Sequence, residues 1–161
     1  MTQQATTEAL RQSVTVPLSQ EGAFALFVDE FADWWPMSSH HIGQRVPGEA
    51  VIEPREGGRW YERDESGADC EWGRVLAVER PKRILLAWQL SPKFEFNPDP
   101  ARATEVEVTF EARGHASTSV TVEHRGFEVH GEGAAAMRDS IAGEGGWGQL
   151  LGLYADSARP K

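Results

Sequence analysis

Hydrophobic and polar residues alternate over most of the chain between residues 50 and 125. The alternation is clearest in TEVEVTFEA, where Val106, Val108 and Phe110 share one face and Glu105 and Glu107 share the other. A period of two residues is the spacing of side chains along a β-strand. The sequence therefore predicts a sheet with one apolar face and one face in water.

Six segments of this kind follow one another along the chain. They are AVIEP, GRWYERD, CEWGRVLAVE, RILLAWQL, TEVEVTFEA and STSVTVEHRGF. The turn-forming runs RDESGAD and ERPKR separate neighbouring segments, as in antiparallel hairpins. A further strand is predicted over residues 11–18 (RQSVTVPL). It lies at an edge or ends near Pro17, because proline has no N–H to donate to a neighbouring strand.

Two other segments have helical spacing. After Ser19, a favourable N-cap, apolar residues recur at helical intervals until Pro36 prevents continuation. The second segment covers residues 132–158, and glycines weaken its middle, so we expect a firm helix only from about Trp147. This order of elements predicts an α+β cup, in which an antiparallel sheet curls around a long terminal helix.

The stretch PREGGRWYE places two glycines directly before a predicted strand. A phosphate-binding loop would need a helix after its glycines, together with a lysine or threonine. Because a strand follows instead, we interpret Gly57 and Gly58 as a turn that uses positive φ. This turn delivers Trp60 to the apolar face of the sheet and Tyr61 to the opposite face.

Composition and charge restrict the classes of partner that we expect for this protein. The chain has 161 residues and a formal net charge of −9. Nucleic acids and anionic membranes attract basic surfaces, so we expect neither a nucleic-acid partner nor membrane insertion. The single cysteine, Cys70, and an N-terminus without an apolar run favour a cytoplasmic location. We expect one domain over residues 1–161, with residues 1–10 as a flexible N-terminus.

Six tryptophans are unusual for a chain of this length. They are Trp34, Trp35, Trp60, Trp72, Trp88 and Trp147. Large aromatic side chains either pack a core or form the rigid walls of a cavity. The sequence leaves both interpretations open.

His124 is the candidate polar group of the apolar face, by its parity with Val120 and Val122. It is either a hydrogen-bonded core histidine or a polar anchor or acid–base group in a cavity. Gln89 and Arg74 are further candidates for polar groups in such a cavity. We interpret several glutamates as solvated residues at strand ends and outward positions, namely Glu53, Glu56, Glu62, Glu71 and Glu79.

Metal and nucleophile chemistry have little support. His40 and His41 lack a third ligand at metal spacing, so we expect no metal, and we expect no cofactor. Cys70 has no cationic neighbour in sequence that would mark a nucleophile.

The loop over residues 91–103 (SPKFEFNPDPARA) combines three prolines with Phe94 and Phe96. Apolar side chains of this size are not needed in a solvated loop. The loop is either a flap over the sheet edge or a lid over a cavity, and both alternatives stay open.

These segments together resemble a known superfamily. The pieces are VPLSQEGAFALF followed by WWP, then EPREGGRWYE, WGRVLAVERPKRILLAW, EVEVTF, VTVEHRGF and GGWGQLLGLYA. In this order they are similar to the START-like (SRPBCC) superfamily, and within it to bacterial homologues of the activator of the heat-shock chaperone ATPase. The resemblance implies a helix-grip fold with a cavity between the sheet and the C-terminal helix. Members of the superfamily include lipid and hormone carriers, polyketide cyclases and oxygenase subunits, so the fold does not fix the activity.

Three functional hypotheses follow from these features. The first is a binding protein for a small hydrophobic or aromatic ligand, lipids included, held between the sheet and the terminal helix. The second is a cyclase, dehydratase or hydrolase that uses His124. The third is a stress-response protein that associates with a chaperone, and a homodimer is a further candidate assembly. The expected ligand-binding residues are Trp35, Trp60, Trp72, Trp88, His124, Trp147 and Leu151, with Phe94 and Phe96 as the lid.

Overall fold

The described residues form a single antiparallel sheet. The computed structural model describes residues 9–36, 47–90, 96–97, 99, 101, 103–142 and 146–158. Seven strands lie in the spatial order β1-β7-β6-β5-β4-β3-β2. Their bounds are Leu10–Val16 (β1), Glu49–Ile52 (β2), Arg59–Arg63 (β3), Asp69–Glu79 (β4), Arg83–Trp88 (β5), Thr104–Gly114 (β6) and Ser117–Arg125 (β7). The predicted strand segments are therefore confirmed, and β1 is an edge strand that ends directly before Pro17.

The helices occupy the two regions that the sequence indicated. The first region contains α1 (Gln20–Phe24), a π-helical turn (Ala25–Asp29) and α2 (Phe31–Trp34). The second contains a 3-10 segment (Phe127–Gly133), α3 (Ala134–Ala142) and α4 (Trp147–Ala158). Ser19 caps α1, since its Oγ accepts a hydrogen bond of 3.0 Å from the Gly22 N–H. The terminal helix α4 begins at Trp147, as expected from the glycines before it.

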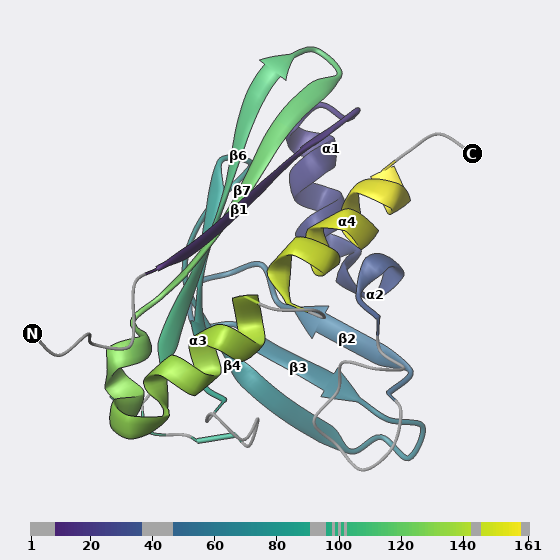
Figure 1. Cartoon of the computed structure of the whole chain (residues 1–161). Helices are drawn as coiled ribbons and strands as arrows, with labels where there is room; N and C mark the ends of the chain where they lie inside the picture. The colour runs from purple at the N-terminus through teal and green to yellow at the C-terminus, as the bar shows by residue number, and fades with distance from the viewer. Residues whose placement is uncertain are drawn as a thin grey trace, which may run out of the picture.

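The helices gather on one side of the curled sheet (Figure 1). Helix α4 crosses this side next to β1 and α2, and α3 contacts both the 3-10 segment before it and α4. The Tyr154 hydroxyl of α4 donates a 2.7 Å hydrogen bond to the Ala23 carbonyl, which ties the terminal helix to the first helical region. The predicted α+β helix-grip fold is confirmed.

Two bulges in β4 help the sheet to curl. The register with β3 shifts between Trp60 and Tyr61, which makes Trp72 an extra residue of β4. A second shift, against β5, does the same for Leu76. A bulge bends its strand and increases the local twist. The turn before β3 follows the prediction at Gly57, which has a φ of +80°, whereas Gly58 does not have a positive φ.

The outer face of the sheet carries a ladder of ion pairs. Arg125 on β7 binds Glu105 and Glu107 on β6, with N–O distances of 3.1 and 2.9 Å. Arg83 on β5 binds Glu107 as well. Hydrogen bonds from Arg125 lower the pKa of Glu107, and those from Arg83 add to the effect. The predicted face in water is confirmed.

Some expectations fall outside the described residues. They concern residues 1–8 of the N-terminus, His40, His41 and Phe94. Within the described ranges, no helix combines the length and apolar character needed to cross a membrane.

Candidate functional site

Five tryptophans form a closed circle of contacts on the inner, helix-covered face of the sheet. Three of them come from neighbouring strands, namely Trp60 from β3, Trp72 from β4 and Trp88 from β5. The other two come from helices, Trp35 from the end of α2 and Trp147 from the start of α4. We refer to these five residues as the tryptophan circle. All five are buried, with at most 6% of the side chain exposed. Large rigid side chains from elements distant in sequence thus converge at one place.

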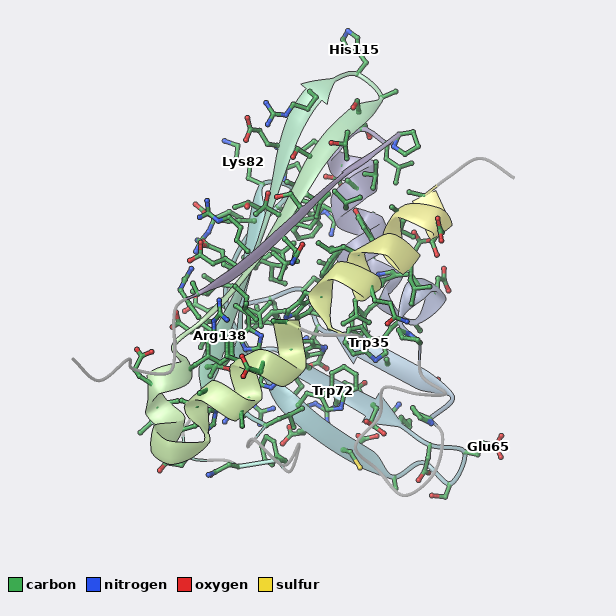
Figure 2. All side chains as sticks on the ribbon, in the orientation of Figure 1. Trp35, Glu65, Trp72, Lys82, His115 and Arg138 are labelled. Atoms are coloured by element: carbon green, nitrogen blue, oxygen red, sulfur yellow. The ribbon has the colours of Figure 1, made fainter. Side chains whose placement is uncertain are left out.

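The distances around the tryptophan circle are those of packed aromatic rings. Trp35 and Trp72, both labelled in Figure 2, have ring centroids 5.1 Å apart. The next contacts are Trp72 to Trp60 at 5.5 Å and Trp60 to Trp88 at 5.4 Å. Trp147 closes the circle, at 6.1 Å from Trp88 and 6.3 Å from Trp35.

Gly73 makes this arrangement possible in the sheet. It pairs with Trp60 on one side and with Trp88 on the other, so the two indoles flank a residue that has no side chain. A Cβ atom at this position would lie 1.7 Å from the Ala87 carbonyl oxygen. Only glycine fits here, and the bulge residue Trp72 next to it also reaches the inner face.

His124 on β7 borders the circle and has both ring nitrogens in hydrogen bonds. Its Nδ1 lies 3.0 Å from the Trp147 Nε1, and its Nε2 lies 2.7 Å from the Thr104 Oγ1. An indole nitrogen can only donate, so Nδ1 is the acceptor. The proton of the neutral ring is therefore on Nε2, and it is donated to Thr104.

Burial keeps His124 neutral. The side chain is fully buried, and its ring lies 5.1 Å from Trp88 and 4.8 Å from Phe127, measured between centroids. Desolvation, with a smaller contribution from His130, lowers the pKa of His124 to about 3. The predicted orientation toward the apolar face is confirmed, and a histidine with this pKa is a weak base near neutral pH.

Glu62 was wrongly predicted to be solvated. It is only 2% exposed, and its Oε1 accepts a 2.8 Å hydrogen bond from the Trp72 Nε1. The signal in the sequence was its parity, because Glu62 stands two residues after Trp60 in the same strand. Thr104 was missed too, although it has the parity of Val106 and its neighbours.

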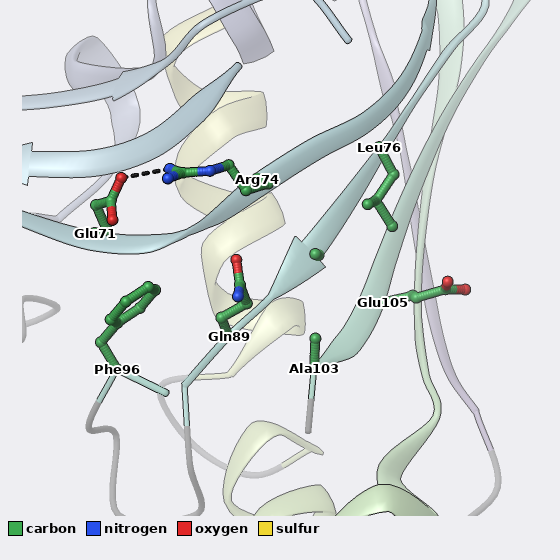
Figure 3. Close-up of a pocket in the computed structure, with 8 residues that line it drawn as sticks. Glu71, Arg74, Leu76, Gln89, Phe96, Ala103 and Glu105 are labelled. Carbon is green, nitrogen blue, oxygen red and sulfur yellow. Dashed lines mark hydrogen bonds and ion pairs between the residues drawn. The ribbon is translucent and has the colours of Figure 1, made fainter. Parts of the chain in front are cut away.

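Gln89 and Arg74 lie on the other face of the sheet. With six more residues they line an outer hollow of about 540 Å³ (Figure 3). The lining residues of this outer hollow are Glu71, Arg74, Leu76, Ala87, Gln89, Phe96, Ala103 and Glu105. Arg74 is paired with Glu71 there. The hypothesis that Gln89 and Arg74 join His124 in one cavity was therefore wrong, because both neighbours of Arg74 in β4 are buried and Arg74 itself alternates outward.

The remaining candidates occupy different places. Leu151 is buried on α4. Phe96 is half-buried, forms a β-bridge with Leu90 and lines the outer hollow.

Cys70 is partly exposed, and burial together with the nearby Glu62 raises the pKa of its thiol, which disfavours a nucleophile. Among the described residues, no three His, Cys, Asp or Glu side chains gather as a metal site would require.

Most of the chain matches a known protein family. Residues 17–153 match the family described as "Activator of Hsp90 ATPase homolog 1-like protein". The chain belongs to this family. No match was found among curated proteins.

Two solved structures are similar over nearly the whole chain. One is an anthrahydroquino-gamma-pyrone synthase, Txn09, with 34% identity over 92% of this chain and 96% of the other, at a TM-score of 0.65. The other is CalC, a self-sacrificing resistance protein from Micromonospora echinospora, with 31% identity over 93% of both chains, at a TM-score of 0.67. The Aha1 dimer from Colwellia psychrerythraea is 13% identical over 94% and 96% of the two chains, at a TM-score of 0.60, and shares the fold. Family and fold together support a domain that contains a cavity.

Proposed function

We propose that this protein binds a small, mostly apolar aromatic molecule between the curled sheet and α4. The observation that carries the proposal is the tryptophan circle, in which five indoles from five elements meet at one place. Aromatic side chains give large contact areas and lose little conformational entropy on binding, since they have few rotatable bonds. Concave sites lined by aromatic residues with a few placed polar groups are typical of small-molecule binding.

The two similar structures support an aromatic ligand of some size. The name of Txn09 describes a product with fused aromatic rings, and CalC is named a resistance protein. Both share about a third of their residues with this chain over nearly its whole length. We therefore propose fused aromatic rings as the ligand class and give lipids second place.

A cyclase-type enzyme is the second candidate, because Txn09 is named a synthase. In that case the His124 ring is a poor acid–base catalyst, since both nitrogens are engaged and its pKa is about 3. Catalysis would then depend on holding the substrate in a reactive shape rather than on proton transfer by His124. Turnover of a bound compound, detected as a change in its mass, would favour this candidate.

A chaperone partner and a homodimer stay proposals. The chaperone rests on the description of the family alone. Pull-down with a purified chaperone and light scattering of the isolated protein are the respective measurements. The lid assigned to Phe94 and Phe96 also stays a prediction, and Phe96 lies at the outer hollow in this structure.

The test of the main proposal is a binding titration followed by tryptophan fluorescence and by native mass spectrometry. The panel contains fluorene, anthracene and anthraquinone as fused aromatic compounds, with palmitate as a lipid. We expect saturable changes in emission and a 1:1 complex with at least one aromatic compound. The variant Leu76→Ser, in the outer hollow, should bind as the wild type does. Failure of every fused aromatic compound to change emission or mass would contradict the proposal.

A further inference from the structure

Two buried indole N–H groups of the tryptophan circle have no hydrogen-bond acceptor. They are Nε1 of Trp60 and Nε1 of Trp88, considered against the described part of the chain. Leaving such a donor buried and unpaired is unfavourable, and phenylalanine would give an aromatic ring without this penalty. Two tryptophans at these positions therefore favour an acceptor beyond those that the described residues supply.

Three other indoles of this region donate to acceptors within the protein. Trp34 donates to the Phe27 carbonyl at 3.3 Å, Trp72 to Glu62 at 2.8 Å and Trp147 to His124 at 3.0 Å. The two acceptors nearest the circle, Glu62 and the His124 Nδ1, are thus already engaged. The unpaired donors are specific to two positions and are not a general property of the core.

These two positions are neighbours in space. Trp60 and Trp88 lie on either side of Gly73 in one row across β3, β4 and β5, and their ring centroids are 5.4 Å apart. Trp88 also contacts the neutral His124 ring. Both donors consequently belong to one buried patch of the inner face.

The charge of the patch restricts the acceptor. No lysine or arginine is among the buried residues that the structure describes, and the one buried acidic side chain there is Glu62. Burying an anion without a cation is strongly unfavourable. A carboxylate or phosphate is therefore a poor partner for the two indoles, whereas a neutral oxygen is a good one.

We propose that Trp60 and Trp88 donate hydrogen bonds to a neutral oxygen on the aromatic ligand, such as a ketone, quinone or ring ether. This inference rests on the proposed function and specifies its ligand class. An aromatic hydrocarbon would contact the same rings but leave the donors unpaired. Selectivity for oxygenated over plain aromatic rings is the consequence.

The test compares 9-fluorenone with fluorene, which have nearly the same shape and differ in one carbonyl group. Equilibrium dialysis against the full chain should show that fluorenone binds about threefold to tenfold more tightly, as one or two net hydrogen bonds allow. The anion 9-oxofluorene-4-carboxylate should bind more weakly than fluorenone. Trp60→Phe and Trp88→Phe should each bring the ratio of the two affinities toward one.

Trp34→Phe is the matched control, because it removes an indole donor that already has an acceptor, and it should leave the affinity ratio unchanged. The wild-type ratio is informative even if a variant fails to fold. Equal affinity of the wild type for fluorenone and fluorene would overturn the inference and leave the proposed function standing. Tighter binding of the carboxylate would overturn the choice of a neutral oxygen. Absence of binding by both neutral compounds would overturn the inference, and the proposed function would fall with it only if anthracene and anthraquinone failed to bind as well.

Discussion

The two faces of the sheet handle polar groups in opposite ways. On the outer face, Arg125 and its glutamate partners share hydrogen bonds in a ladder that stays in contact with water. On the inner face, His124 and Glu62 lie among indoles, and Trp147 and Trp72 donate hydrogen bonds to them. The same alternating strands supply both faces, since residues of opposite parity point in opposite directions.

The difference shows in the ionisation of the two faces. Arginine partners lower the pKa of Glu107 and so favour its charge, whereas desolvation lowers the pKa of His124 and so removes its charge. Exposed pairs contribute only about 0–1 kcal/mol each because water screens them. Substitutions on the inner face should therefore lower the free energy of unfolding far more than substitutions on the outer face.

The largest expected effect comes from Gly73→Ala. The new Cβ would stand 1.7 Å from the Ala87 carbonyl oxygen, and backbone cannot move aside as a side chain can. We expect a loss of about 3 kcal/mol in the free energy of unfolding, at the upper end for overpacking. Urea denaturation measures this loss.

Gly152→Ala in α4 is the control, because a Cβ there meets no described atom within 4 Å. It should stabilise the protein by about 0.5–1 kcal/mol, as alanine does over glycine within a helix. An equally small effect of Gly73→Ala would show that the row Trp60, Gly73, Trp88 is not tightly packed.

The next effect concerns pH. The folded-state pKa of His124 is depressed from 6.5 to about 3, so its contribution to stability is present above pH 6.5 and is lost as the pH falls toward 3. As the pH falls from roughly 7 to 5, linkage predicts that the free energy of unfolding decreases by about 2 kcal/mol because of this residue. His124→Gln should be less stable at neutral pH but should lack this part of the pH dependence.

Urea denaturation at several pH values measures how the free energy of unfolding changes with pH. His115→Gln is the control, since His115 is exposed on the turn between β6 and β7 (Figure 2). If the wild type and His124→Gln lose stability in parallel over this range, His124 is not held neutral by burial.

The smallest effect is expected on the outer face. Arg125→Met removes ion pairs with Glu105, Glu107 and Glu123 while it keeps an apolar stem. The loss should be about 0.5–1 kcal/mol and should shrink in high salt, because these charges are partly exposed. Denaturation with and without added sodium chloride measures it. A large loss of stability that does not depend on salt would contradict the difference proposed between the two faces.

The alternation along the chain was enough to predict the strands, the covered face and the position of His124. Parity also placed Trp60 inward and Tyr61 outward, where Arg59 lies 4.1 Å from the centre of the tyrosine ring. Parity would have found Glu62 as well, but its charge suggested a solvated residue. Burial of a carboxyl group depends on a partner from another strand, here Trp72, which no local pattern reveals.

The circle itself could not be predicted from local patterns. The bulge at Trp72 breaks the period of two, and it is visible only in the pairing of β3 with β4. The hydrogen bond between Trp147 and His124 joins α4 to β7 across 23 residues of sequence. Long-range contacts of this kind decide which tryptophans meet, whereas composition only shows that there are many.

The most direct measurement follows the six indole N–H signals by two-dimensional ¹H–¹⁵N NMR during addition of 9-fluorenone. Single Trp→Phe variants assign the signals. The account predicts that the signals of Trp60 and Trp88 shift downfield as their donors become hydrogen-bonded, while that of Trp34 stays in place. Unchanged signals of Trp60 and Trp88, with shifts confined to the backbone amides of Gln89 and Phe96, would place the ligand in the outer hollow and contradict the central claim.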